Sequence, residues 1–243
     1  MDGIYLGDAL NLPLPNGSVH LVVTSPPYNV GKEYEETLTT EEYIYTFTHN
    51  WIQECGRVLV DGGRLCINIA NTGRKPYVDL RSMIARIAEP LEFLERGEII
   101  WDKGDAVARG KTTWGSWCKP SNPVIRDEHE YILVYSKKDY NLVCDGYGAS
   151  DITPKEFSDN TLSVWNIAPA PKISWHQCPF PEEIPRRLIK LYTAPGMVVL
   201  DCFSGSGTTC RVAKSLGRHY IGFDKERKYV NLSNRLLGGG LFQ

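Results

Sequence analysis

Short, continuous apolar runs alternate with helix-like stretches along most of this 243-residue chain, and this alternation constrains the fold more than any other feature. Such runs are typical of strands that are buried on both faces of a parallel sheet. Strands are therefore expected at residues 4–6, 19–24, 64–69, 98–101, 131–136, 198–202 and 220–223. The pattern predicts a doubly wound α/β fold.

Helices are expected between these strands, at residues 40–58, 78–89, 182–192, 208–216 and 225–237. Thr39 or Thr40 is a candidate N-cap of the first helix, and the pair Gly62-Gly63 is expected to end that region. Pro181 stands just before the third helix, where proline is favoured. The first and third helices thus carry recognisable start or stop signals.

Two longer stretches, residues 102–127 and 139–175, lack any regular apolar pattern. Loops of this length inside a compact domain are usually functional or mobile. We therefore expect one domain over residues 1–243, with these two stretches as insertions that carry binding elements.

Composition limits the class of protein. The formal net charge of −2 excludes a basic tail protein, so any polyanion must meet a local basic patch. Seven scattered cysteines without a C-x-x-C pair predict no disulfide framework and no metal site. No apolar run reaches membrane-spanning length and no export signal is evident. These features predict a cytoplasmic protein with no membrane partner.

A glycine turn follows the strand expected at residues 198–202. Gly205 and Gly207 let the backbone turn sharply and approach a ligand closely. Asp224 ends the next strand, where a carboxylate can accept hydrogen bonds from ribose hydroxyls. The turn lacks a third glycine and a Gly-Lys pair, so a nucleoside ligand without phosphates fits it best. A plain strand–turn–helix corner would explain the glycines but not Asp224.

A second motif, Thr-Ser-Pro-Pro-Tyr-Asn at residues 24–29, follows the strand expected at residues 19–24. Prolines cannot donate to a sheet, and each favours an extended residue before it. The chain therefore leaves the sheet stiffly, with carbonyls free to accept from an amine and the Tyr28 ring beside them. A simple strand terminator would explain the two prolines alone.

Residues 24–28 resemble the catalytic motif of the amino-methyltransferases, which use S-adenosylmethionine (SAM) to methylate the exocyclic amine of cytosine or adenine. Residues 201–207 (Asp-Cys-Phe-Ser-Gly-Ser-Gly) resemble the SAM-binding motif of these enzymes. The catalytic motif comes first, which is the permuted order of the beta class. The resemblance implies a Rossmann-like, mostly parallel sheet of seven strands.

Three further segments resemble parts of the same family. Residues 7–9 resemble the loop that contacts the SAM adenine, residues 129–135 a strand near the target-base pocket, and residues 176–181 a segment over the methionine end. The residues expected to bind the cofactor are Asp8, Thr24, Phe180, Asp201, Phe203, Ser204, Gly205, Gly207, Thr208 and Asp224.

The expected catalytic residues are Ser25, Pro26, Pro27 and Tyr28. The lone pair of an exocyclic amine is delocalised into its ring, so acceptors around the N–H groups favour the nucleophilic nitrogen. We assign this role to the Ser25 hydroxyl and the Pro26 carbonyl. Tyr28 is expected to stack on a base flipped out of its duplex. Direct in-line transfer to nitrogen requires no cysteine nucleophile.

The resemblance associates serine before Pro-Pro-Tyr with cytosine N4, and aspartate or asparagine with adenine N6. Ser25 therefore predicts a site-specific DNA cytosine-N4 methyltransferase of the restriction-modification type, which leaves S-adenosylhomocysteine as its product. Four alternatives stay open: the same chemistry on structured ribosomal RNA, N6-adenine methylation of DNA, an inactive SAM- and nucleic-acid-binding module, and a small-molecule methyltransferase. The last would leave the Pro-Pro-Tyr motif unexplained.

Basic residues and tryptophans in the first insertion suit a nucleic-acid contact, because cations bind phosphates and aromatic rings stack on bases. The alternative is that the tryptophans fill a small core of their own. The expected contacts are Lys32, Lys103, Arg109, Lys111, Trp114, Trp117, Lys119 and Arg126. By resemblance, a cognate restriction endonuclease and a second copy of the chain are candidate partners.

Overall fold

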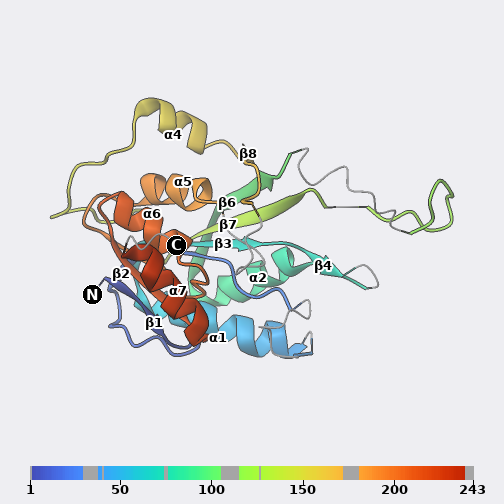
Figure 1. Ribbon diagram of the computed structural model, residues 1–243, viewed down its shortest axis with the longest axis horizontal. Helices are drawn as coiled ribbons and strands as arrows, with labels where there is room; N and C mark the ends of the chain where they lie inside the picture. The colour runs from blue at the N-terminus through green and yellow to red at the C-terminus, as the bar shows by residue number, and fades with distance from the viewer. Residues whose placement is uncertain are drawn as a thin grey trace.

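The computed structural model describes residues 2–29, 38–39, 41–73, 76–104, 115–125, 127–171 and 181–238. These residues form an eight-stranded sheet covered by helices, with a separate two-stranded ribbon of β4 (Thr72–Gly73) and β5 (Tyr77–Val78) (Figure 1). The strands of the main sheet lie in the order β1-β10-β9-β2-β3-β7-β6-β8. Their bounds are β1 Gly3–Leu6, β2 Val19–Thr24, β3 Leu59–Ile69, β6 Phe93–Asp102, β7 His129–Lys137, β8 Val164–Asn166, β9 Val198–Asp201 and β10 His219–Asp224.

The sheet is mostly parallel. Only β7 runs against its neighbours, β3 and β6, and every other neighbouring pair in the main sheet is parallel. This arrangement confirms the predicted α/β class. All seven expected strands are present, and the short β8 adds an eighth at the edge beside β6.

Helices cover both faces of the sheet. One face carries the π-helical η1 (Glu42–Thr48), α1 (His49–Val58), α2 (Leu80–Ala88) and the short η2 (Glu89–Leu91); the other carries α5 (Glu183–Tyr192), α6 (Thr208–Ser215) and α7 (Arg227–Leu237). Successive side chains of a strand point to opposite faces. In β2, Val22 accordingly packs with the first group, while Leu21 and Val23 pack with the second. Two apolar cores therefore hold the strands rigid.

The first helix begins close to its expected cap: the residue that precedes η1 is Glu41, and Thr39 exchanges hydrogen bonds with Glu42, the first residue of η1. Thr39 Oγ1 accepts from the backbone N–H of Glu42 at 3.2 Å, and the Glu42 carboxylate accepts from the Thr39 N–H at 2.9 Å; Thr40 is outside the described residues. The expectation for Gly62-Gly63 is wrong, because both lie inside β3. Gly62 has φ +75°, and a Cβ there would lie 2.0 Å from the Asn141 carbonyl oxygen. The glycine thus permits close chain contact within a strand.

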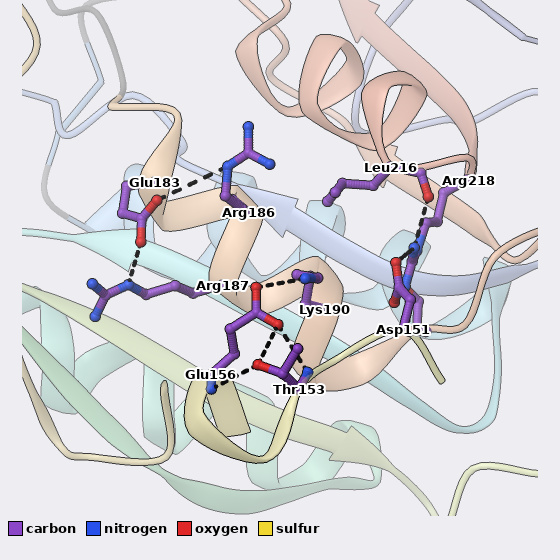
Figure 2. A network of polar contacts seen from close by, with 10 residues as sticks. Asp151, Thr153, Glu156, Glu183, Arg186, Arg187, Lys190, Leu216 and Arg218 are labelled. Carbon is purple, nitrogen blue, oxygen red and sulfur yellow. Dashed lines mark hydrogen bonds and ion pairs between the residues drawn. The ribbon is translucent and has the colours of Figure 1, made fainter. Parts of the chain in front are cut away.

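The second insertion is more ordered than the sequence predicts. It contains α4 (Pro154–Asn160), whose N-cap Thr153 forms a capping box with Glu156, followed by β8. Figure 2 shows how the segment is held against the body: Asp151 binds the guanidinium of Arg218 with two contacts of 2.6 Å, and Glu156 accepts from Lys190 of α5 at 2.5 Å. The Arg218 side chain is fully buried. The segment is therefore docked on the helices and does not project freely.

The first strand and the last described helix meet at the β1 edge of the sheet. Asn234 of α7 binds both backbone groups of Ile4: its Nδ2 donates to the Ile4 carbonyl at 2.7 Å, and its Oδ1 accepts from the Ile4 N–H at 3.4 Å. Among the described strands, β1 pairs with β10 alone. The side-chain amide thus occupies hydrogen-bonding groups that an edge strand otherwise leaves open.

In the described part of the chain, every helix is too short or too polar to cross a membrane.

Candidate functional site

The polar residues expected to form a site gather at one edge of the sheet. Parallel strands present their carboxyl ends together, and open α/β sheets bind ligands there. Thr24 ends β2, Asp201 ends β9 and Asp224 ends β10. Asp8 comes two residues after the end of β1. Leu6 at that end lies opposite Asp224, so Asp8 is close to the same edge. Four separate segments therefore bring candidate ligand-binding groups to a common edge.

The glycine turn between β9 and α6 is fixed by backbone geometry. Gly205 and Gly207 have φ values of +46° and +73°, which side chains disfavour. A Cβ on Gly207 would lie 2.6 Å from Ile4 Cδ1 and 3.0 Å from Ser233 Cβ. Asp224 Oδ2 accepts from the Gly205 N–H at 2.9 Å. The turn therefore requires glycine at both positions, and its backbone is held by the carboxylate that is expected to bind ribose.

Asp201 connects this turn to the catalytic strand. Its Oδ1 accepts from the Thr24 hydroxyl at 2.8 Å and from the Phe203 N–H at 3.1 Å. Burial raises the pKa of Asp201 to about 6, although these hydrogen bonds oppose the shift. Burial likewise raises the pKa of Asp224. The Asp201 carboxyl thus acts as a brace between β2 and the start of the turn.

Other expected cofactor residues line or support the turn. The Ser204 hydroxyl is buried and has no hydrogen-bond partner among the described residues, so a ligand that donates or accepts here would satisfy it. Thr208 begins α6, and the Phe203 ring packs edge-on against Trp51 at 5.6 Å between centroids. Asp8 is exposed, and its Oδ1 accepts from the Leu10 N–H at 3.0 Å. Phe180 is outside the described residues.

This donor and acceptor set fits a nucleoside. The Asp224 carboxylate suits hydroxyl donors, the unpartnered Ser204 hydroxyl suits a polar group, and the glycines allow close backbone approach. Among the described residues no cluster of metal-binding side chains occurs.

The expected catalytic segment leaves β2 in a tightly held conformation. Pro26 is buried, and the Pro27 carbonyl accepts from the Tyr43 hydroxyl of η1 at 2.5 Å. Ser25 Oγ lies 3.1 Å from the Tyr28 hydroxyl oxygen. Asn29 follows at φ +53°, with its Nδ2 donating to the Leu38 carbonyl at 3.1 Å. Contacts with neighbouring side chains therefore fix the position of the Ser25 hydroxyl.

The Tyr28 hydroxyl lies in a polar cluster whose contacts the sequence did not predict. It is 3.1 Å from Glu130 Oε2 and accepts from Asn68 Nδ2 at 2.9 Å. Lys103 contacts the other carboxylate oxygen of Glu130 and lies over the Trp101 ring at 4.8 Å. Lys103, expected to contact phosphates, instead forms this ion pair. Burial and the Glu130 charge raise the pKa of Tyr28 well above its usual value, so the phenol stays neutral.

We call Ser25, Tyr28, Asn68, Lys103 and Glu130 the polar cluster. Its members come from the segment after β2, from β3, from just beyond β6 and from the start of β7, which meet because β7 runs antiparallel to its neighbours. The available signal was the segment at residues 129–135, which includes Glu130 and resembles a strand near the target-base pocket. Nothing in the linear pattern gives the register that places Glu130 beside Tyr28.

Besides Lys103, two of the expected nucleic-acid contacts lie in the described part of the chain, Trp117 and Lys119. They belong to residues 115–125, which extend away from the sheet beyond β6 and β7 (Figure 1). Trp117 is 71% exposed, so the alternative that it fills a small core is wrong. Lys32, Arg109, Lys111, Trp114 and Arg126 are outside the described residues.

Comparison with known proteins gives consistent matches. The sequence model of the N6/N4 DNA methylase family matches residues 19–235. The type II methyltransferase M.MjaI of Methanocaldococcus jannaschii is 31% identical, and the alignment covers 97% of this chain and 90% of that protein. The DNA adenine methyltransferase YhdJ of Escherichia coli is 28% identical, with 96% of this chain and 82% of YhdJ covered.

A similar solved structure is TTHA0409 of Thermus thermophilus, described as a putative DNA modification methylase complexed with S-adenosyl-L-methionine. It superposes with a TM-score of 0.77 at 28% identity and covers 99% of this chain and 94% of its own. The architecture is therefore shared with a SAM-bound protein over nearly the whole length.

Proposed function

The chain belongs to the N6/N4 DNA methylase family, in the beta-class motif order of the SAM-dependent amino-methyltransferases, and from this premise we propose that it methylates the N4 amine of a cytosine flipped out of DNA. The class of chemistry follows from the family. The choice of cytosine depends on Ser25, because serine before Pro-Pro-Tyr is the feature that resembles cytosine-N4 enzymes.

One observation supports the proposal above the others. The hydrogen bond of 2.8 Å between Thr24 and Asp201 joins the residue before Ser25 to the start of the glycine turn. These residues are far apart in sequence, yet they are in direct contact at the carboxyl edge of the sheet. A methyl acceptor held at Ser25 and a methyl donor held at the turn would therefore be neighbours.

The cofactor is assigned to the glycine turn. Asp224 would accept from the ribose hydroxyls, and Asp8 lies where the loop after β1 would contact the adenine. Ser204 would satisfy its buried hydroxyl on the ligand. When bound, SAM supplies the electrophilic methyl group.

The catalytic task of the protein is to make a weak nucleophile react. The Ser25 hydroxyl and the Pro26 carbonyl would accept hydrogen bonds from the amine N–H groups and so direct its lone pair outward. Acceptors that are fixed before the reaction cost no reorganisation as charge develops. Because the Tyr28 phenol stays neutral, it does not serve as a base; its ring would contact the flipped base.

DNA is the proposed polymer, with Trp117 and Lys119 as contacts for unstacked bases and phosphates. Adenine N6 is the second candidate function, because one relative that matches most of the chain is a DNA adenine methyltransferase. Structured RNA stays an open alternative, while a cognate endonuclease, a homodimer and a cytoplasmic location stay predictions of the sequence.

The test uses purified protein with methyl-tritiated SAM and two substrates in parallel, unmethylated duplex DNA and structured ribosomal RNA. The product is digested to nucleosides and separated by chromatography. Label in N4-methyldeoxycytidine is expected. Label in N6-methyldeoxyadenosine would overturn the choice of base, label in RNA the choice of polymer, and SAM binding without transfer would favour the inactive module.

A further inference from the structure

The Glu130 carboxylate is held from three directions inside the polar cluster. Lys103 contacts Oε1, while Asn68 Nδ2 donates to Oε2 at 2.6 Å and the Tyr28 hydroxyl approaches Oε2 at 3.1 Å. The side chains of Glu130 and Lys103 are only 14% and 20% exposed. An ion pair this well enclosed, next to the catalytic segment, fixes the position of its charge.

The charge decides where the one hydroxyl hydrogen of Tyr28 points. Asn68 Nδ2 donates to the Tyr28 oxygen at 2.9 Å, so this contact uses a lone pair of the phenol. Among the described residues, two carbonyl-type acceptors lie within reach of the hydrogen, Glu130 Oε2 at 3.1 Å and the Asn68 backbone carbonyl at 3.3 Å. A carboxylate is the nearer and stronger acceptor. The phenol therefore donates to Glu130.

The donation from Tyr28 to Glu130 also fixes the role of the Ser25 hydroxyl. Ser25 Oγ lies 3.1 Å from the Tyr28 oxygen. Since the phenol has no second hydrogen to offer, Ser25 must donate to Tyr28. Both lone pairs of Ser25 Oγ then stay available for a donor on the substrate.

We propose that Glu130 is a positioning residue that, acting through Tyr28, makes the Ser25 hydroxyl an obligatory hydrogen-bond acceptor toward the target amine. The inference rests on the proposed function. A hydroxyl that donated to the amine would occupy the nitrogen lone pair that must attack the methyl group. A hydroxyl that accepts from an N–H leaves that lone pair free. The direction of one hydrogen bond thus separates an activating contact from an inhibiting one.

The first variant is Glu130→Gln, which keeps the size of the side chain and removes its charge. The glutamine amide can donate to Tyr28, which releases the phenol hydrogen to Ser25 and reverses the chain. We expect kcat on duplex DNA to fall at least ~10-fold, with the Kd for SAM changed less than about 2-fold. Glu98→Gln is the matched control: Glu98 pairs with Arg81 on the same sheet but outside the polar cluster, and its kcat should match the wild type.

The deciding experiment combines Glu130→Gln with Tyr28→Phe. Without the phenol hydroxyl, Glu130 has no route to Ser25, so adding Glu130→Gln to Tyr28→Phe should change kcat less than about 2-fold further. If Glu130 only buttresses the sheet, its effect will appear in full in the Tyr28→Phe background, and the inference is overturned. Glu130→Asp keeps an acceptor and should retain more activity than Glu130→Gln.

A second measurement needs neither activity nor folded Glu130→Gln. A buried tyrosine hydroxyl bonded to a carboxylate gives a downfield proton resonance at low temperature, and Tyr28→Phe should remove that signal. Its absence from the wild type overturns the inference. If the wild type transfers no label to any nucleic acid, the proposed function fails, while this resonance still reports whether Tyr28 donates to Glu130.

Discussion

The two halves of the site are built in different ways. The cofactor half, from Asp201 to Asp224, depends mostly on backbone: two glycines at positive φ and amides held by carboxylates. The chemical half depends on side chains, because the polar cluster draws one or two groups from each of several strands. The first half is nearly continuous in sequence, whereas the second assembles only when the sheet forms.

This difference predicts how each half fails. A substitution in the cofactor half should disturb the fold of the turn, because its residues hold each other's backbone. A substitution in the polar cluster should leave the strands in place and change the chemistry alone. The two halves touch through Thr24 and Asp201, so their separation can be tested by measuring SAM binding and turnover side by side.

The largest effect is expected in the chemical half, for Ser25→Ala. Loss of a fixed acceptor at the reacting amine should lower kcat about 100-fold, equal to about 2.7 kcal/mol. The Kd for SAM should stay within about 2-fold of the wild type in calorimetry. Ser158→Ala, on the exposed surface of α4, is the control and should leave both values unchanged. Parallel losses of SAM binding and turnover in Ser25→Ala would erase the distinction between the halves.

In the cofactor half, Gly207→Ala should lower the free energy of unfolding by about 3 kcal/mol, because positive φ and collision with Ile4 and Ser233 both contribute. Gly196→Ala is the matched control, since Gly196 has φ +85° but open space around it. This control should lose only about 1 kcal/mol. Denaturant unfolding measures both. Equal losses would show that the close packing under the turn does not contribute.

The brace between the halves should show in pH dependence. Burial raises the pKa of Asp201 from 3.8 to about 6, so the folded protein favours the protonated carboxyl. The stabilisation from this preference is complete below pH 3.8 and is lost as pH rises through about 6. Asp201→Asn should therefore gain stability relative to the wild type between about pH 4 and 6, by on the order of 2 kcal/mol.

Denaturant unfolding of Asp201→Asn and the wild type across this range gives the difference directly, because other titrating groups are common to both proteins. A difference that stays constant from about pH 4 to 7 would contradict the raised pKa.

The smallest effect is expected outside both halves, at the tip formed by residues 115–125. Lys119→Met should reduce the slope of log affinity against log salt for duplex DNA by about 1, with little loss of affinity at low salt. Lys155→Met on α4, also exposed but on the docked segment, should leave the slope unchanged. If Lys155→Met lowers the slope instead, the docked segment is the one that meets DNA.

The features that are continuous along the chain could be predicted from the sequence, whereas contacts that form only when separate strands meet could not. The strands, the glycine turn and the placement of Asp224 at the edge followed from apolar runs and spacing. Lys103 and Glu130 could not be paired in advance, because their contact depends on the register of β7 against β6. Helix α4 was missed although Thr153 and Glu156 carry a capping-box pattern, because seven residues are too few to show a helical period.

The contact between Ile4 and Asn234 has a consequence for protein synthesis. Strand β1 leaves the ribosome well before its partner strand, β10, which ends at Asp224. At typical rates of translation, β1 waits on the order of 10–40 s for that partner. Strand β2 must likewise remain ready for β9. The nascent chain therefore carries β1 unpaired until β10 is made, and Asn234 secures the edge only when α7 is made.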